Sequence, residues 1–196
     1  MNNVGLKNSS QNLVRELPVG KAYINLCPAE TNLILVVPLV EEMGINYIFN
    51  YLSRNKNGSI GKGGNVSFYR KLDISSNRVI NADFSIDEYV ENIENKETGL
   101  TLRKTPDDHY GLTYTYSLND KNDGSIIYNG PVYDYPCQII SPNKTKTRIT
   151  TSLGKITVAS NNYSTVLKMG NDGFVKEIEY KHKEKVLKKV TIVWRW

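Results

Sequence analysis

The chain has 196 residues, a length that fits one domain or two small ones. With 39% hydrophobic residues and 13 tyrosines it is too apolar for a disordered chain, and its longest apolar run, residues 33–40, is too short for a membrane-spanning helix. Two cysteines and two histidines exclude a disulfide scaffold and a cysteine- or histidine-rich metal centre. The net charge of +5 is moderate and indicates solubility, so we expect a globular protein that binds no metal and no cofactor.

Residues 1–18 form a polar N-terminal segment, and we expect a single β-rich domain over residues 19–196. The segment has no apolar stretch behind a basic start, which is the pattern of a secretory signal peptide. We expect the protein either to stay in the cytoplasm or to be exported by a route without such a signal. Asparagine, lysine and isoleucine are abundant and have AT-rich codons, which favours a low-GC bacterium as the source.

Apolar and polar residues alternate along several segments, which is typical of half-buried strands. The alternation runs through residues 45–52, 66–72, 110–118 and 190–196. Pairs of a polar residue and glycine, the chemistry of tight hairpin turns, lie between such segments: Asn57-Gly58, Asp123-Gly124, Asn129-Gly130 and Asp172-Gly173. The sequence therefore predicts a mainly β fold, an antiparallel meander of hairpins that forms either an open, shell-like sheet or a sandwich.

One segment has the helical period. Ile86, Tyr89, Val90 and Ile93 are spaced as one face of a helix, and Ser85 with Glu88 fits a capping box. We predict a single short helix over residues 86–96, with another strand as the alternative. The many acidic residues of this segment are assigned to a solvated helix face rather than to a metal site.

The sequence contains no recognisable catalytic motif, and we expect no enzyme activity. The glycine-rich segment 58–64 lacks the Gly-Lys-Ser/Thr of a phosphate loop and precedes a predicted strand, so it is assigned to a turn. His109 and His182 have no serine or cysteine partner at a recognisable spacing. Cys27 and Cys137 are expected to be reduced thiols, although a fold that brings them within about 7 Å would allow them to pair.

Two stretches are basic, residues 54–71 and 181–196. Nucleic-acid binding needs such stretches interleaved with exposed aromatic residues. The aromatic residues here alternate as a buried face does, so we expect no nucleic-acid partner.

Residues 19–72 carry a resemblance to a known family. The matching elements are Asn25, Thr31-Asn32-Leu33, Pro38-Leu39, Tyr51-Leu52-Ser53-Arg54, Gly61-Lys62-Gly63, Phe68-Tyr69 and Arg70-Lys71-Leu72. In this order they resemble the opening of the Rhs/YD-repeat shell proteins, although Gly64 stands where the family has tryptophan. The resemblance implies a bacterial, toxin-associated structural protein whose strands form part of a shell around a toxin and perform no chemistry of their own.

We therefore expect a non-enzymatic scaffold that acts through protein–protein contacts, either with a partner or by self-association through its sheet edges. The run 190–196 ends without a turn and would be most stable when paired, so the chain is expected to be a fragment of a longer polypeptide or to self-associate. The alternative is a carbohydrate- or surface-binding β-sandwich of a phage tail or adhesin. Four aromatic residues form the candidate interaction surface: Tyr133, Tyr135, Trp194 and Trp196.

Overall fold

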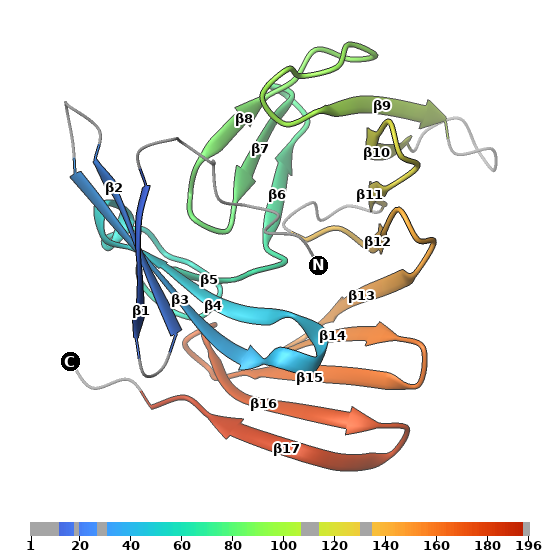
Figure 1. Ribbon diagram of the computed structural model, residues 1–196. Helices are drawn as coiled ribbons and strands as arrows, with labels where there is room; N and C mark the ends of the chain where they lie inside the picture. The colour runs from blue at the N-terminus through green and yellow to red at the C-terminus, as the bar shows by residue number, and fades with distance from the viewer. Residues whose placement is uncertain (1–11, 18–19, 27–30, 107–113, 130–134, 194–196) are drawn as a thin grey trace.

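Within each sheet of the described chain, consecutive strands pair with each other, and every pairing is antiparallel. The computed structural model describes residues 12–17, 20–26, 31–106, 114–129 and 135–193 (Figure 1). The predicted fold class is confirmed, because the described chain is mainly β and its only helices are two single turns, η1 (Glu41–Met43) and η2 (Tyr51–Ser53).

Three sheets follow one another along the chain. The first has five strands: β1 (Asn12–Leu17), β2 (Gly20–Leu26), β3 (Thr31–Val40), β4 (Ile45–Asn50) and β5 (Gly64–Val66). The second has three: β6 (Arg70–Asp73), β7 (Arg78–Asn81) and β8 (Ile86–Glu88). The third has nine: β9 (Leu100–Pro106), β10 (Tyr114–Asp120), β11 (Ser125–Tyr128), β12 (Gln138–Ile140), β13 (Lys146–Ser152), β14 (Lys155–Ser160), β15 (Tyr163–Met169), β16 (Val175–His182) and β17 (Lys185–Thr191).

Two of the predicted Asp-Gly turns connect hairpins of the nine-stranded sheet. Between β10 and β11, Asp120 Oδ1 accepts hydrogen bonds from the amides of Asn122 and Gly124, and Asp123 takes a positive φ of 63°. Between β15 and β16, Gly173 has a φ of 77°, a conformation that glycine adopts without strain. These turns keep consecutive strands adjacent and so produce the meander.

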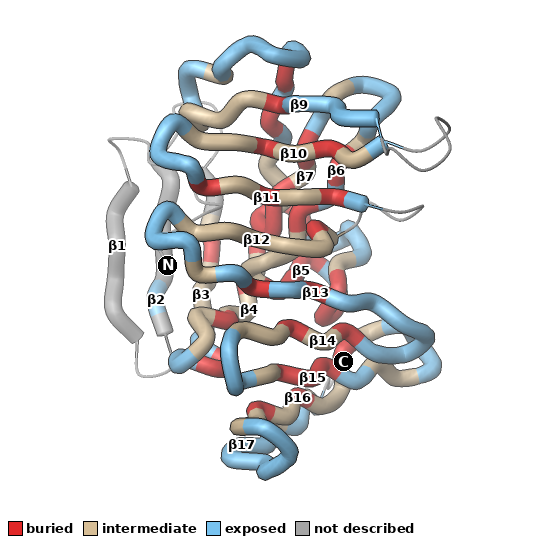
Figure 2. The backbone as a smooth tube through the Cα atoms, turned by 90° about the vertical axis from the view of Figure 1, so that its right-hand side faces the viewer, coloured by how far each residue is buried: buried red, intermediate tan, exposed pale blue. Residues whose placement is uncertain are grey.

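The nine-stranded sheet forms one wall, and the two smaller sheets cover different parts of it (Figure 1). Val40, Ile45 and Val66 of the five-stranded sheet share a buried cluster with Leu167 and Ile178 of β15 and β16. The three-stranded sheet contributes to a second cluster, together with β9–β11: Leu72, Val79, Leu102, Leu118 and Tyr128. Figure 2 shows buried positions in the middle of most strands of the long sheet and mainly exposed positions on β17.

The helix predicted over residues 86–96 is wrong. Residues 86–88 form β8, which pairs with β7, and the chain beyond Glu88 continues in turns. The apolar residues that suggested the helix do not form a buried stripe, since Val90 is 62% and Ile93 is 59% exposed. Asp87 is buried instead and accepts a 2.7 Å hydrogen bond from Asn81 Nδ2. Pairing with β7 therefore overrides the local helical pattern.

Buried asparagines tie the five-stranded sheet to the three-stranded one. Asn50 Nδ2 donates to the carbonyl oxygen of Asp83 at 2.6 Å, and Asn65 Nδ2 donates to that of Ala82 at 3.1 Å. Asn65 Oδ1 also accepts from the amide of Ser59 at 2.7 Å. The turn after β7 is thereby held against β4 and β5, so the angle between the two small sheets is fixed by polar contacts as well as by packing.

Candidate interaction edge

The last three strands of the nine-stranded sheet combine one apolar face with one charged face. Along β16, Val175, Ile178 and Tyr180 are buried in the core. Glu177 and Glu179 occupy alternate positions and point to the opposite face, because side chains alternate along a strand. The sequence pattern thus places a row of carboxylates on the outer surface of the sheet, next to lysines from β15 and β17.

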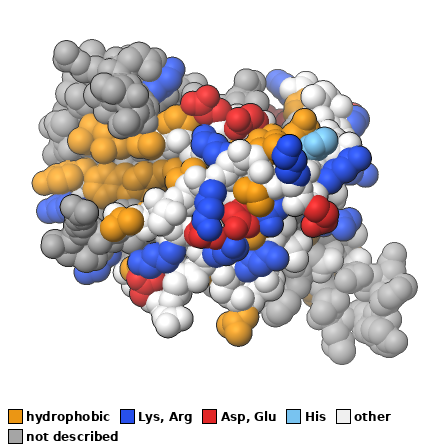
Figure 3. Space-filling view, turned by 90° about the horizontal axis from the view of Figure 1, so that it is seen from below, with side chains coloured by type: hydrophobic (Ala, Val, Ile, Leu, Met, Phe, Trp, Pro, Cys, Tyr) orange, Lys and Arg blue, Asp and Glu red, His pale blue; other side chains and the backbone are white. Residues whose placement is uncertain are grey.

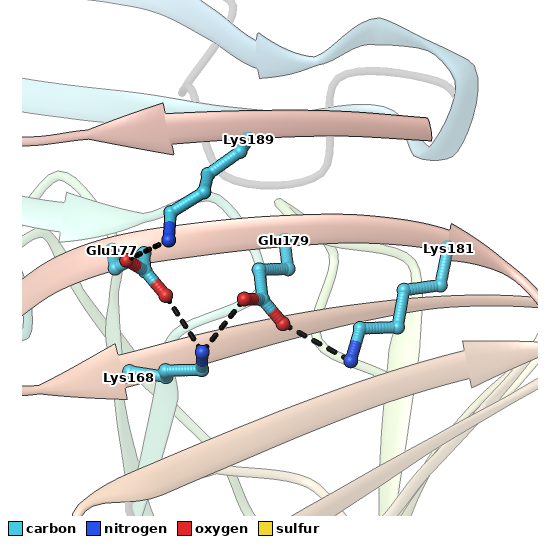
Figure 4. A network of polar contacts seen from close by, with 5 residues as sticks. All are labelled: Lys168, Glu177, Glu179, Lys181 and Lys189. Atoms are coloured by element: carbon cyan, nitrogen blue, oxygen red, sulfur yellow. Dashed lines mark hydrogen bonds and ion pairs between the residues drawn. The ribbon is translucent and has the colours of Figure 1, made fainter. Parts of the chain in front are cut away.

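These charges form a ladder across three strands (Figure 4). Lys168 Nζ of β15 lies 2.6 Å from Glu177 Oε1 and 2.7 Å from Glu179 Oε1. Lys181 contacts the second oxygen of Glu179 at 3.0 Å, and Lys189 of β17 contacts the second oxygen of Glu177. The ladder fastens β17 to β16 and β15, so the final strand is held in place by ion pairs as well as by backbone hydrogen bonds.

The ion pairs displace the pKa values of the groups that form them. Hydrogen bonds from Lys168 and then Lys181 lower the pKa of Glu179 to about 2. Bonds from Lys168 and Lys189 lower the pKa of Glu177, and the two glutamates raise the pKa of Lys168. Glu177, Glu179 and Lys168 are therefore charged at neutral pH.

Strand β17 has an exposed surface and a side on which no described strand pairs with it. Its side chains are almost all exposed, including the apolar Val186 (45%) and Leu187 (50%). Within the described part of the chain, β17 pairs with β16 alone. Seen from below, the molecule presents basic and acidic side chains close together, beside an area of apolar side chains (Figure 3).

The outward backbone groups of β17 follow from its register. The amide of Ile192 donates to the carbonyl oxygen of Lys176 at 2.8 Å, and Val190 lies opposite Ile178. Along an antiparallel ladder, residue pairs that exchange backbone hydrogen bonds alternate with pairs whose backbone groups point away from each other. The N–H and C=O groups of Lys189 and Thr191, which oppose Glu179 and Glu177, therefore point away from β16 and toward the free side.

The first part of the opposite edge of the same sheet, at Leu100 and Leu102, is covered. The amides of Asn92 and Asn95 donate to the carbonyl oxygens of Leu102 and Leu100 in β9, at 2.8 and 2.9 Å. Pro106, which has no N–H to donate, occupies the last position of β9. Strand addition at this edge would require displacing residues 92–95, whereas β17 has no such cover among the described residues.

Of the four predicted interaction residues, only Tyr135 lies in the described part of the chain. Tyr135 lies far from β17 in sequence. Its ring centroid is 5.8 Å from that of Phe68 and 5.4 Å from that of Tyr69. It thus takes part in aromatic packing at the side of the main core. Tyr133, Trp194 and Trp196 lie outside the described residues, as does Cys27. Cys137 is a free thiol, and partial burial raises its pKa.

The glycine-rich segment forms a turn, as predicted, and its amides bond to its own backbone. Gly58 and Gly64 both donate to the carbonyl oxygen of Gly61, and Gly63 donates to that of Lys56. A Cβ on Gly58 would lie 2.0 Å from the carbonyl oxygen of Gly64, so the glycine permits a close backbone approach. These amides serve the turn and are not directed at a ligand.

Three buried polar side chains in the described residues are incompletely hydrogen-bonded. Arg70, Asn81 and Tyr128 are buried, and each has one side-chain atom without a hydrogen-bond partner. No group of three or more His, Cys, Asp or Glu side chains in the described ranges is placed to hold a metal ion. None of the described helices has the length and apolar character needed to cross a membrane.

Comparison with known proteins adds no relative. No protein-family model matches the sequence, and no curated protein matches it.

Proposed function

We propose that the chain is a non-enzymatic structural β module that acts through protein–protein contacts at its sheet edges. In this proposal it serves as a wall segment of a larger assembly, like the opening of the Rhs/YD-repeat shells that residues 19–72 resemble in sequence. The observation that carries the proposal is the difference between the two edges of the nine-stranded sheet. The first part of β9 is covered by residues 92–95 and its last residue is Pro106, whereas β17 presents outward backbone groups.

The ion-pair ladder supports the same proposal. An edge strand that frayed would offer no fixed template to another chain, and ordering it on binding would cost conformational entropy. Lys168, Glu177 and Lys189 connect three consecutive strands, which holds the edge in the geometry that an added strand needs.

The proposal is tested by the effect of salt on self-association. Lysines on β17 repel a second copy at low ionic strength, and raising the salt concentration from about 0.1 to 1 M shortens the screening length from about 10 to 3 Å. We therefore expect the mass measured by light scattering to rise with salt and protein concentration. The variant Thr191→Pro removes an outward N–H without removing a bond to β16, and it should abolish the rise.

Circular dichroism is the control for the fold of Thr191→Pro. A monomer at every salt and protein concentration, with no difference between wild type and variant, would contradict the proposed function. Saturable binding on a glycan array, retained by Thr191→Pro, would favour the carbohydrate-binding alternative instead.

A further inference from the structure

We propose that the free side of β17 binds an acidic, extended segment of a partner chain, which becomes a tenth strand of the nine-stranded sheet. This inference rests on the proposed function and identifies the chemistry of the partner. Main-chain hydrogen bonds to Lys189 and Thr191 would provide the affinity, and the side chains of β17 would select the sequence that binds.

The charge of β17 is the first argument. The strand contains Lys185, Lys188 and Lys189 and no acidic residue, so it carries three positive charges. Lys189 is neutralised by Glu177, but Lys185 and Lys188 form no ion pair with any described residue. Glu184 precedes the strand and is exposed in the turn. Two lysines on the edge are therefore uncompensated, and opposite charges directly across from them would stabilise an added strand.

The same charges disfavour a second copy of this chain as the natural occupant. Two copies of β17 would place lysines opposite lysines, which is destabilising. Pairing of β17 with the β9 edge of another copy would bring it against Arg103 and Lys104, both exposed, and would also require residues 92–95 to leave. At ordinary ionic strength the edge therefore disfavours pairing with a second copy of the chain and favours pairing with an acidic strand.

The apolar residues of β17 define the rest of the partner's pattern. Val186 and Leu187 are about half exposed, next to the lysines. An added strand that alternates acidic and β-branched residues would place carboxylates near Lys185 and Lys188 and cover part of this apolar surface. Burial of that surface would add to the main-chain bonds.

The test uses the full chain and three synthetic peptides of about eight residues, the length of an ordinary strand. Valine alternates with glutamate in the first, with lysine in the second and with serine in the third. Binding is followed by NMR titration and by hydrogen exchange of the backbone amides of Lys189 and Thr191. We expect the glutamate peptide to slow exchange at both amides and to bind about tenfold more tightly than the serine peptide. The lysine peptide should bind more weakly still.

Two charge-reversal variants, one at the edge and one away from it, test whether the lysines of β17 select the peptide. The double variant Lys185→Glu/Lys188→Glu should reverse the order of the acidic and basic peptides. Lys146→Glu/Lys155→Glu makes the same charge change at exposed positions of β13 and β14 and should leave that order unchanged. A thermal unfolding curve of each variant shows that its fold is retained.

The outcomes separate this inference from the proposed function. If the serine and glutamate peptides slow hydrogen exchange at Lys189 and Thr191 equally, the preference for an acidic partner is wrong, but binding of a strand at this edge is supported. No protection of Lys189 and Thr191 by any peptide, or protection of β9 instead, overturns the inference. The proposed function is judged independently, by whether salt-dependent association requires Thr191.

Discussion

The backbone amide of Val175, the first residue of β16, donates a 3.2 Å hydrogen bond to the carbonyl oxygen of Ser59. Ser59 belongs to the glycine-rich turn next to β5, and its Oγ accepts a 3.0 Å bond from the amide of Val66. One turn therefore joins the five-stranded sheet to the strand that supports β17. The orientation of the proposed binding edge depends on this turn and on the polar groups around it.

Asn65 should be among the most important polar residues for stability. It is fully buried, accepts from Ser59 and donates to Ala82, so Asn65→Ala leaves two buried backbone groups without partners. We expect the free energy of unfolding, measured with urea, to fall by about 2 to 4 kcal/mol. Asn122→Ala, at an exposed turn position, is the control and should change it by less than about 0.5 kcal/mol. Equal losses for the two variants would show that Asn65 does not join the sheets.

Asp83 should make the protein less stable as the pH rises. Burial raises the pKa of its carboxyl group, so the folded state holds the proton more tightly than the unfolded state does. Stability is then lost as the pH rises from the ordinary value of 3.8 through the raised pKa. Asp83→Asn keeps an oxygen for Ser85 and should be more stable than wild type at pH 7, by an amount that shrinks in acid.

Asp73 provides a control for which the Asp→Asn substitution should change stability at pH 7 in the opposite direction. Hydrogen bonds from Ser75 and Ser76 lower the pKa of this exposed carboxylate, so Asp73→Asn should reduce stability at pH 7. Urea titrations of both variants at pH 3 to 7 provide the measurement. A change of the same sign at pH 7 in the two variants would refute the role of burial at Asp83.

Glu179 should stabilise the edge at neutral pH and lose this effect in acid. Because its pKa is lowered from 4.5 to about 2, its contribution is complete above pH 4.5 and disappears as the pH falls toward 2. Glu179→Gln should therefore lower Tm at pH 7 and flatten the decline of Tm between these two pH values. Glu184→Gln removes an exposed carboxylate that forms no ion pair with the described residues and is the matched control. Parallel Tm profiles for wild type and Glu179→Gln would contradict the prediction.

Tyr128 should tolerate the loss of its hydroxyl group. The side chain is fully buried, and its oxygen has no partner among the described residues. Tyr128→Phe removes an unsatisfied polar group, so unfolding in urea should show unchanged stability or a gain of about 1 kcal/mol. Tyr89→Phe, which removes a 3.4 Å bond to Thr98, should cost about 0.5 kcal/mol. A clear loss in Tyr128→Phe would reveal a bound water or ligand at that oxygen.

The sequence predicted most of the sheet because the signals for strands and hairpins are local. Tyr116 and Leu118 alternate with polar residues and both are buried in β10, and Asp123-Gly124 forms the turn that follows. The segment after Ser85 was wrong because its structure is set by distant residues. Ser85 bonds to Asp83 rather than capping a helix, and Asp87 is held by Asn81 of the neighbouring strand.

The interaction edge was only partly predictable. The alternation over residues 190–196 predicted a strand that needs a partner, but β17 runs from Lys185 to Thr191 and overlaps that segment only at its first two residues. The cover on β9 depends on Asn92 and Asn95 reaching Leu102 and Leu100, a contact that no residue pattern reveals. The sequence does not show which lysines of β17 are available to a partner, because that depends on which lysines Glu177 and Glu179 already neutralise.

The order of the strands also bears on how the protein reaches its native state. Every pairing in the nine-stranded sheet joins neighbours in the chain, so each hairpin can form as soon as its second strand has been synthesised. Such local pairing involves short loops and a small loss of loop entropy, which speeds folding. In synthesis from the N-terminus, the two smaller sheets emerge before the nine-stranded one, and β17 is made after the other strands described here. The strand proposed to meet another chain therefore forms against a wall whose other strands have already been synthesised.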